Sequence, residues 1–423
     1  MRMKKQKLTI SVFFMLLAAV VLFTQCKKDD KTTFVLETLM SGTIDMNGAT
    51  PPNNVPTNPT IVATFSVDVD AASVTAANVI LNRIYDNTNI AVTVAVSGKT
   101  VTITPIEVLG NGAQFKLTFP TINSSDGQSI PGFNRTFTTL GTFAPAGVVA
   151  YWNFENNTND QVGTYNASAS VDIVYQDSRN TAAGKAAFFN GTTSIIEIPN
   201  GDQLDNTHDF TLSFWVKTKS DGHVDAGGNP KGHFVMGLGA FKGFQFEIPG
   251  DYGSCKLAAS YELADGTTAS EDLWFNGSGQ YNANGGWQGW TFCKDLTGSG
   301  GVAALLKDKW AHVVCTYDAT TKIGTMYING EKMKAQDFNL WPTGDPKTGV
   351  KGLKYGGVTP DVYPTLAFGF IQSREGTMWA TEPWGGYNFP TSNHFGGWLD
   401  DIRIFHKAIT ETEVSLMYQS EKP

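Results

Sequence analysis

Cysteine and the short motifs of common catalytic sites are scarce in this 423-residue chain. Its four cysteines show no Cys-x-x-Cys spacing, so the sequence offers neither a paired-cysteine zinc site nor a dithiol redox motif. It also contains no Gly-x-Ser-x-Gly elbow, no His-Glu-x-x-His zinc helix and no Gly-x-x-x-x-Gly-Lys phosphate loop. These absences argue against the hydrolases, metalloproteases and nucleotide-binding enzymes that depend on such motifs.

The sequence has only one long apolar run, residues 8–23, and four basic residues precede it: Arg2, Lys4, Lys5 and Lys7. A helix that spans a bilayer needs roughly 20 apolar residues, so this run is too short for an ordinary membrane helix. It predicts the core of a signal peptide over residues 1–25, which is removed on export.

A cysteine ends this segment in the string Leu22-Phe23-Thr24-Gln25-Cys26. The string resembles the lipobox of bacterial lipoproteins, although Gln25 stands where a small residue is usual. The following Lys27-Lys28-Asp29-Asp30 resembles the export signal of Bacteroidetes surface lipoproteins. The resemblance implies that Cys26 carries the lipid and that residues 26–35 form a tether. It also implies an outer-membrane protein facing the cell exterior, with outer-membrane transport proteins as expected partners.

The composition after the leader is acidic and rich in strand-forming residues. Without the four basic leader residues, 27 basic side chains face 39 acidic ones, a net charge of −12. Such a charge repels nucleic acid and anionic lipid headgroups, so neither is an expected partner. The 44 glycines, 27 phenylalanines and 13 tyrosines suit short strands joined by glycine-rich turns. We therefore expect an all-β chain, and its length suggests two domains.

Residues 36–140 alternate strand-like segments with turns, most clearly at 60–66, 101–104 and 114–119. With Val55-Pro56-Thr57-Asn58-Pro59 and Arg135-Thr136-Phe137-Thr138-Thr139, these segments resemble the bacterial immunoglobulin-like (Ig-like) domains of surface proteins. The resemblance implies a β-sandwich that serves as a spacer. Residues 141–147 form a Gly/Pro/Ala linker.

Residues 148–423 contain a longer series of strand-like segments, at 149–155, 186–191, 194–198, 210–217, 309–314, 324–331 and 397–405. A short helix follows over 410–419, and Thr410 with Glu413 would form its capping box. In this order the segments resemble the laminin-G-like, concanavalin A-like jelly roll. The resemblance implies two antiparallel sheets packed face to face, with the first and last strands as neighbours.

Four stretches are longer than such a sandwich needs: 218–232, 265–303, 339–362 and 373–396. Long loops on a rigid scaffold are frequent binding surfaces, and two of these are rich in aromatic residues. Sugar rings present flat apolar faces and a rim of hydroxyls, which aromatic platforms with polar neighbours can hold. We therefore expect carbohydrate binding by these loops, through Trp274, Trp287, Trp290, Trp379, Trp384 and Tyr387.

Three alternatives remain beside this hypothesis. The aromatic residues could instead pin the loops onto the sandwich, or the domain could be an adhesin that recognises a host or matrix protein. A glycoside hydrolase is the third, because concanavalin A-like folds also include glycosidases. The sequence lacks the Glu-x-Asp-x-x-Glu strand of laminarinase-type glucanases. The pairs Glu271-Asp272 and Asp400-Asp401 are consecutive residues, which a regular strand points to opposite faces.

A structural calcium ion is expected where the first and last strands of the jelly roll meet. Similar carbohydrate-binding modules hold calcium with carboxylates from both ends of the domain, and Glu155 and Asp400 match those positions. Calcium takes six to eight oxygens, so two carboxylates need backbone carbonyls or waters to complete the shell, and the loop 156–160, with Asp160 as a further metal candidate, could provide them. Alternation puts Asp400 on the apolar face of Ile402 and Ile404, where a cation would offset the cost of burial.

The remaining cysteines are Cys255, Cys293 and Cys315. A disulfide between Cys255 and Cys293 would be compatible with an oxidising exterior, but the sequence does not determine the pairing. Cys315 lies in an apolar strand and is expected to be a buried thiol.

Overall fold

The computed structural model describes residues 31–423. They form two compact units. One comprises the described residues up to Leu109 together with Gln114–Leu140, and the other comprises Gly110–Ala113 and Gly141–Pro423. Cys26 and the rest of the predicted leader lie outside the described residues. Nowhere in residues 31–423 is there a helix long and apolar enough to cross a membrane.

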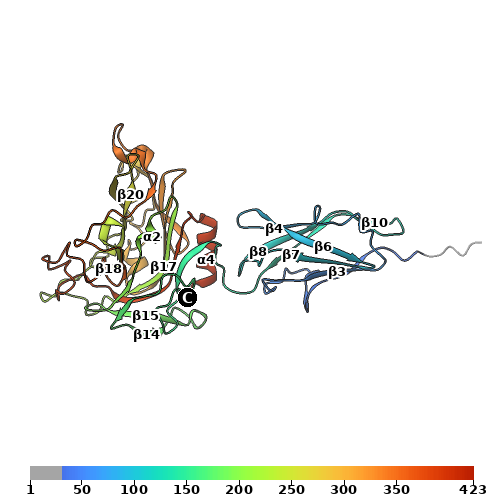
Figure 1. Ribbon diagram of the computed structural model, residues 1–423, viewed down its shortest axis with the longest axis horizontal. Helices are drawn as coiled ribbons and strands as arrows, with labels where there is room; N and C mark the ends of the chain where they lie inside the picture. Colours follow the sequence, from blue (N-terminus) through green and yellow to red (C-terminus); the bar gives the residue numbers. More distant parts are fainter. Residues whose placement is uncertain (1–30) are drawn as a thin grey trace, which may run out of the picture. The chain divides into compact units, whose positions relative to one another are not determined.

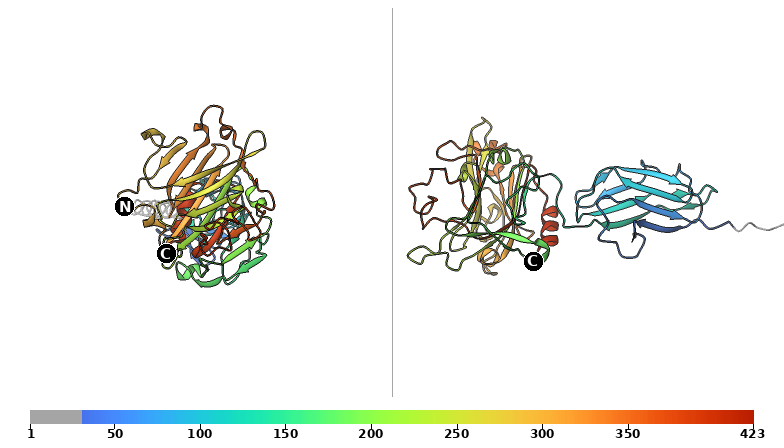
Figure 2. Two further views of the ribbon diagram at one scale, coloured as in Figure 1. Left: turned by 90° about the vertical axis from the view of Figure 1, so that its left-hand side faces the viewer. Right: turned by 60° about the horizontal axis from the view of Figure 1, so that its bottom comes forward.

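The first unit is a β-sandwich. Its strands are β1 (Leu36–Ser41), β2 (Ile44–Asp45), β3 (Ile61–Phe65), β4 (Ile80–Arg83), β5 (Thr88–Ile90), β6 (Val92–Ser97), β7 (Thr100–Pro105), β8 (Gln114–Phe119), β9 (Ile122–Asn123), β10 (Ser129–Ile130) and β11 (Phe133–Thr138). One antiparallel sheet has the order β2-β1-β3-β7-β6, another has the order β11-β8-β4-β5, and β9 pairs with β10 in a separate two-stranded sheet. The strands of this unit are coloured blue to cyan in Figure 2. Along β8, exposed and buried residues alternate, and Phe115, Leu117 and Phe119 enter the core.

The second unit has two larger antiparallel sheets (Figure 1). The first contains β12 (Val148–Trp152), β14 (Val174–Asp177), β15 (Lys185–Asn190), β17 (Phe210–Thr218), β22 (Trp290–Cys293), β23 (Trp310–Asp318), β24 (Ile323–Ile328), β25 (Glu331–Asp337) and β28 (Gly396–Phe405). Its order is β14-β15-β28-β17-β23-β24-β25-β22, with β12 also paired to β28. The first and last strands of the domain are therefore neighbours, as the resemblance implied.

The other sheet contains β13 (Ala169–Val171), β16 (Ile195–Ile198), β18 (His233–Leu238), β19 (Phe244–Ile248), β20 (Cys255–Glu262), β21 (Thr268–Phe275), β26 (Gly352–Leu353) and β27 (Leu366–Phe368). Its order is β13-β16-β27-β18-β19-β20-β21, with β26 also paired to β20. The helices are short: α2 (Asp202–Asp205), α3 (Ala303–Leu306), α4 (Glu411–Glu421) and the 3-10 turns η1 (Thr181–Ala183), η2 (Ala240–Lys242), η3 (Asn282–Asn284), η4 (Phe338–Leu340) and η5 (Pro346–Gly349).

Period-two alternation builds the core between these sheets. On β17, Phe210, Leu212, Phe214 and Val216 enter the core, and the intervening residues Thr211, Ser213 and Trp215 are buried on the opposite face of the sheet. Phe214 meets Phe246 of the opposite sheet with ring centroids 5.1 Å apart. The predicted capping box forms at α4, where Thr410 and Glu413 satisfy each other's backbone N–H groups.

Of the predicted long loops, the structure contradicts one, residues 265–303, and confirms another, residues 373–396. Residues 265–303 are not one loop, because β21 and β22 lie within them. Residues 373–396 do lack strands and helices until β28 begins. Part of this loop, including Met378 and Trp379, packs on a cluster with Phe234, Ala367 and Phe370. These are residues of β18, β27 and the turn after it, so the loop covers part of the second sheet.

Candidate functional site

Three tryptophans meet where the edges of the two sheets approach each other. Trp274 lies on β21, the outermost strand of one sheet, and Trp290 lies on β22, the outermost strand of the other. Trp287 belongs to the connection between these strands. The ring centroid of Trp290 is 5.7 Å from that of Trp274 and 6.3 Å from that of Trp287. Trp287 is 65% exposed, Trp274 38% and Trp290 5%, so two indoles face solvent and the third supports them.

These tryptophans line a recess of about 220 Å³, which we call the tryptophan recess. Its remaining lining residues are Glu271 and Asp272. An adjoining recess of about 220 Å³ shares Asp272 and Trp274 and extends over Glu247 and Lys256. Glu271 and Asp272 are consecutive, yet both reach the tryptophan recess because β21 has no neighbouring strand on that side. The site therefore combines apolar ring faces with carboxylate acceptors.

Lysines hold the carboxylates around the recess in place. Lys256 Nζ lies 3.1 Å from Glu247 Oε1 and 3.0 Å from Asp272 Oδ2, which places it between the two acids. Burial opposes the charge on Lys256, but Glu247 and Asp272 outweigh this effect and raise its pKa. Lys347 contacts Glu271 Oε2. Each carboxylate of the tryptophan recess thus has one oxygen bound to a lysine.

A buried lysine lies behind Trp290. Lys334 of β25 pairs with Met326, a residue of the core between the sheets, so its side chain points inward. Its ammonium lies over the Trp290 ring, and Nζ has no hydrogen-bond partner among the described residues. Burial lowers the pKa of Lys334 to about 6. Lys334 has no signal in the sequence, because the bulge between β24 and β25 decides which way its side chain points.

The predicted aromatic residues of the last loop form a separate cluster. Trp379 and Trp384 have ring centroids 5.0 Å apart, and Trp384 is 42% exposed. Trp379 also contacts Phe241, and the Tyr387 hydroxyl donates a hydrogen bond to the Thr193 carbonyl at 2.5 Å. These contacts hold the loop against the sheet. The six predicted residues therefore divide into two groups, and the recess belongs to the first.

The three residues expected to bind calcium do not share a site in the structure. Asp160 accepts four backbone hydrogen bonds, from the N–H groups of Tyr151, Val162, Thr164 and Tyr165. Glu155 Oε1 accepts one from the Lys185 N–H at 3.0 Å, and Asp400 Oδ2 lies 2.7 Å from Arg179 Nη1. Within residues 31–423, no three His, Cys, Asp or Glu side chains gather so that they could hold a metal ion.

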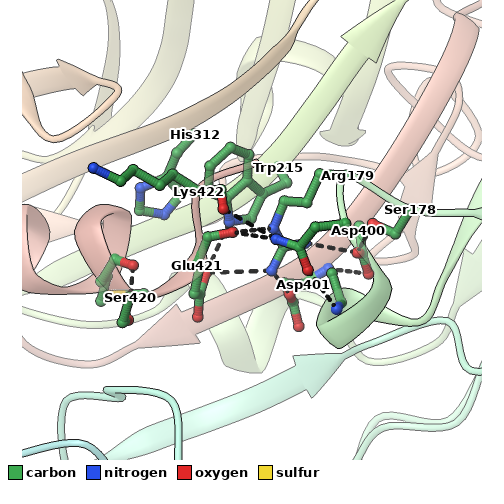
Figure 3. A network of polar contacts seen from close by, with 12 residues as sticks. Ser178, Arg179, Trp215, His312, Asp400, Asp401, Ser420, Glu421 and Lys422 are labelled. Atoms are coloured by element: carbon green, nitrogen blue, oxygen red, sulfur yellow. Dashed lines mark hydrogen bonds and ion pairs between the residues drawn. The ribbon is translucent and has the colours of Figure 1, made fainter.

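A buried charge network surrounds Asp400 (Figure 3). Arg179 lies between Asp400, Asp401 and Glu421, with nitrogen–oxygen distances of 2.7, 2.5 and 3.7 Å. Arg403 pairs with Glu421 at 2.8 Å. Burial and the neighbouring Asp401 raise the pKa of Asp400 to about 8. Burial acts against the charge of Asp401 too, but Arg403 and Arg179 outweigh it and lower its pKa.

The expectation that Asp400 and Asp401 point to opposite faces was wrong. The pairing of β17 and β28 shifts register between Ser213 and Trp215, and Asp401 adopts a positive φ of 46°. This bulge turns two consecutive carboxylates toward one guanidinium. Asp400 therefore does not share the core-facing side of Ile402.

The three described cysteines are free thiols, so the suggested bond between Cys255 and Cys293 does not form in the structure. Cys255 Sγ donates to Met326 Sδ at 3.6 Å inside the core, and burial raises its pKa to about 12. Cys315 is a fully buried thiol, as expected.

Family comparisons agree with this architecture. Residues 41–139 match the model of the bacterial Ig-like domain, and residues 190–360 match that of the concanavalin A-like lectin/glucanases superfamily. The predictions of an Ig-like domain followed by a laminin-G-like, concanavalin A-like domain are confirmed. No curated protein matches the chain.

Several solved structures are similar to the chain at low identity. The receptor-binding domain of botulinum neurotoxin type G is 14% identical with a TM-score of 0.40, covering 65% of this chain and 51% of that one. The binding domain of Paraclostridial Mosquitocidal Protein 1 is 15% identical with a TM-score of 0.41, covering 65% and 52%. Domain 4 of AbnA, a GH43 extracellular arabinanase from Geobacillus stearothermophilus, was solved with arabinotriose. It is 18% identical with a TM-score of 0.38, covering 65% and 100%. The match spans about half of the neurotoxin and mosquitocidal domains.

Proposed function

We propose that the second domain binds carbohydrate at the tryptophan recess and that the chain is a lipid-anchored surface protein. The observation that supports the binding site is the convergence of three indoles with two carboxylates at an exposed edge of the sandwich. A sugar ring stacks its C–H face on an indole, and its hydroxyls donate hydrogen bonds to carboxylate oxygens. Trp274 and Trp287 are the exposed platforms in this arrangement.

The charges around the recess favour binding over hydrolysis. A glycosidase needs two carboxylates placed on either side of the bond that it cleaves, one to transfer a proton and the other to act as nucleophile or base. Here Lys256 joins Glu247 to Asp272, and Lys347 binds Glu271. Carboxylates bound to lysines in this way orient hydroxyls rather than exchange protons with the substrate.

The anchoring part of the proposal depends on the sequence. Cys26 follows a signal-peptide core within a lipobox-like string, and the charged tetrapeptide Lys27-Lys28-Asp29-Asp30 comes next. In this arrangement the Ig-like domain is a spacer between the membrane and the glycan-binding domain. Capture of polysaccharide for neighbouring outer-membrane transport proteins would be its role in the cell. Recognition of a host or matrix protein is the alternative that a binding screen distinguishes.

The test is binding of residues 31–423 to a glycan array and to polysaccharide affinity gels. Trp287→Ala and Trp274→Ala should each weaken retention, since one aromatic contact contributes about 1–2 kcal/mol, or roughly 5- to 30-fold. Phe292→Ala is the matched control, because Phe292 is an exposed aromatic residue of β22 that lines a different groove. Retention by both tryptophan variants at wild-type strength, or binding to matrix proteins alone, would contradict the proposal.

A further inference from the structure

The charged groups that the tryptophan recess presents to a ligand are carboxylates, and none of its lining side chains is basic. Its lining in the described part of the chain consists of Trp274, Trp287, Trp290, Glu271 and Asp272. An ionised carboxylate only accepts hydrogen bonds, so a ligand must supply the donors. The exposed indole faces carry negative π density and attract positive rather than negative groups.

The lysines nearby do not reverse this polarity. Lys347 binds Glu271 from outside the recess. Lys256 lines only the adjoining recess, where Glu247 and Asp272 both contact its ammonium. The three carboxylates therefore exceed the two ammonium groups by one negative charge.

Lys334 lies on the interior side of Trp290, and its pKa of about 6 leaves it mostly neutral at pH 7.5. It offers no counter-charge to a ligand in the recess at that pH. An anionic sugar would therefore bring its own acceptors against carboxylates of the same charge, and such like-charge contacts weaken the binding of a partner.

We infer that the tryptophan recess selects neutral or amino sugars and excludes acidic ones, with Glu271 and Asp272 as the specificity-determining residues. This inference rests on the proposed function. Hydroxyl and ammonium groups both donate to carboxylates, and bonds to an ionised acceptor are stronger than those between neutral groups. Uronic acids, sialic acids and sulfated sugars bring acceptors of the same charge to the same place.

The experiment uses residues 31–423 and matched glycan pairs that differ in one acidic group, at pH 7.5. Suitable pairs are sialylated and desialylated oligosaccharides, and uronic-acid polymers with their carboxyl-reduced forms. We expect the neutral and amino glycans to bind. The affinity for the acidic member of each pair should be at least about tenfold lower, as like-charge repulsion predicts. Acidic glycans bound as tightly as their neutral partners would overturn the inference.

A variant series assigns the effect to the two carboxylates. The double variant Glu271→Gln, Asp272→Asn removes both negative charges and keeps the size of the side chains. It should bind the acidic and neutral members of a glycan pair with similar affinity. Asp272→Asn alone should reduce the affinity difference between the acidic and neutral glycans in part. Because the Asp272 side chain is 45% exposed, this single variant replaces the double variant if the latter unfolds. Glu331→Gln is the control, because the Glu331 carboxylate pairs with Lys294 outside the recess. This substitution should leave the ratio of neutral-glycan to acidic-glycan affinity unchanged.

The two proposals fail in distinguishable ways. If the double variant folds and keeps the wild-type ratio of neutral-glycan to acidic-glycan affinity, the role of Glu271 and Asp272 is refuted. Acidic glycans whose retention depends on Trp287 refute the inference but leave carbohydrate binding intact. The absence of binding to every glycan on the array refutes the proposed function and the inference with it.

Discussion

Replacing Lys334 by methionine should stabilise the second domain, and the gain should grow as the pH falls. Lys334 is fully buried, its ammonium has no hydrogen-bond partner among the described residues, and its pKa is about 6. The unfolded chain holds a lysine proton up to a pKa near 10.5, whereas the folded chain releases it above pH 6. Methionine has similar length and no charge, so it removes this penalty and keeps the packing against Trp290.

The magnitude follows from proton linkage. Between pH 10.5 and pH 6 the unfolded state binds one more proton than the folded state, so stability falls as the pH falls. The slope is at most about 1.4 kcal/mol per pH unit. Below pH 6 both states are protonated and the full penalty remains. The difference between Lys334→Met and wild type should therefore be about 2 kcal/mol larger at pH 6.5 than at pH 8.

Urea unfolding followed by tryptophan fluorescence measures this difference. All ten tryptophans lie after residue 141, so the signal reports only the second domain. Lys332→Met is the matched control, two residues earlier on β25, where the ammonium pairs with Glu411 at 2.7 Å and remains partly exposed. It should change stability by less than about 1 kcal/mol, without a pH trend. A pH-independent difference for Lys334→Met, or a loss of stability, would show that the ammonium has a partner and refute the reasoning.

Two further predictions concern anchoring and calcium. Cys26→Ser should abolish labelling by a palmitate analogue and release the protein from the outer membrane; undiminished labelling would contradict the lipoprotein assignment. Calcium binding by Glu155, Asp160 and Asp400 stays a prediction: millimolar calcium should raise the melting temperature, chelation should lower it, and Asp400→Asn should erase the difference. Identical melting curves in calcium and chelator would end that prediction, and the Arg179 pairing of Asp400 favours this outcome.

Strands could be predicted from the sequence where apolar and polar residues alternate, because the apolar residues are the buried ones. Phe115, Leu117 and Phe119 mark β8 because every second side chain of that strand enters the core. The tryptophan recess was partly predictable, because its three indoles lie within 17 residues of one another. Its two carboxylates were noticed only as an unsuitable glycosidase pair. Their role depends on β21 being an edge strand, and strand order is set by contacts distant in sequence.

The contacts on the outer face of the first sheet of this domain could not be predicted from the sequence. Arg179 carries no local signal of its role, and it meets Asp400 and Asp401 only because β15 and β28 are neighbours in the sheet. The bulge at Asp401 then reverses the face assigned by alternation. A register shift of one residue moves a side chain to the other face, so a single bulge was enough to make the predicted surroundings of Asp400 wrong.

The same geometry explains why the proposed binding residues and the buried charges of Arg179 and Glu421 occupy different parts of this domain. Arg179 and Glu421 form buried ion pairs around β28 beside helix α4, and a recess of about 190 Å³ lies against them. At β21 and β22 the sheets end, and an edge must be protected from pairing with other chains. Indoles and lysine-bound carboxylates cover this edge with groups that do not extend the sheet. The same groups would contact a sugar ring in the proposed function, so protection of the edge and the proposed ligand recognition depend on the same residues.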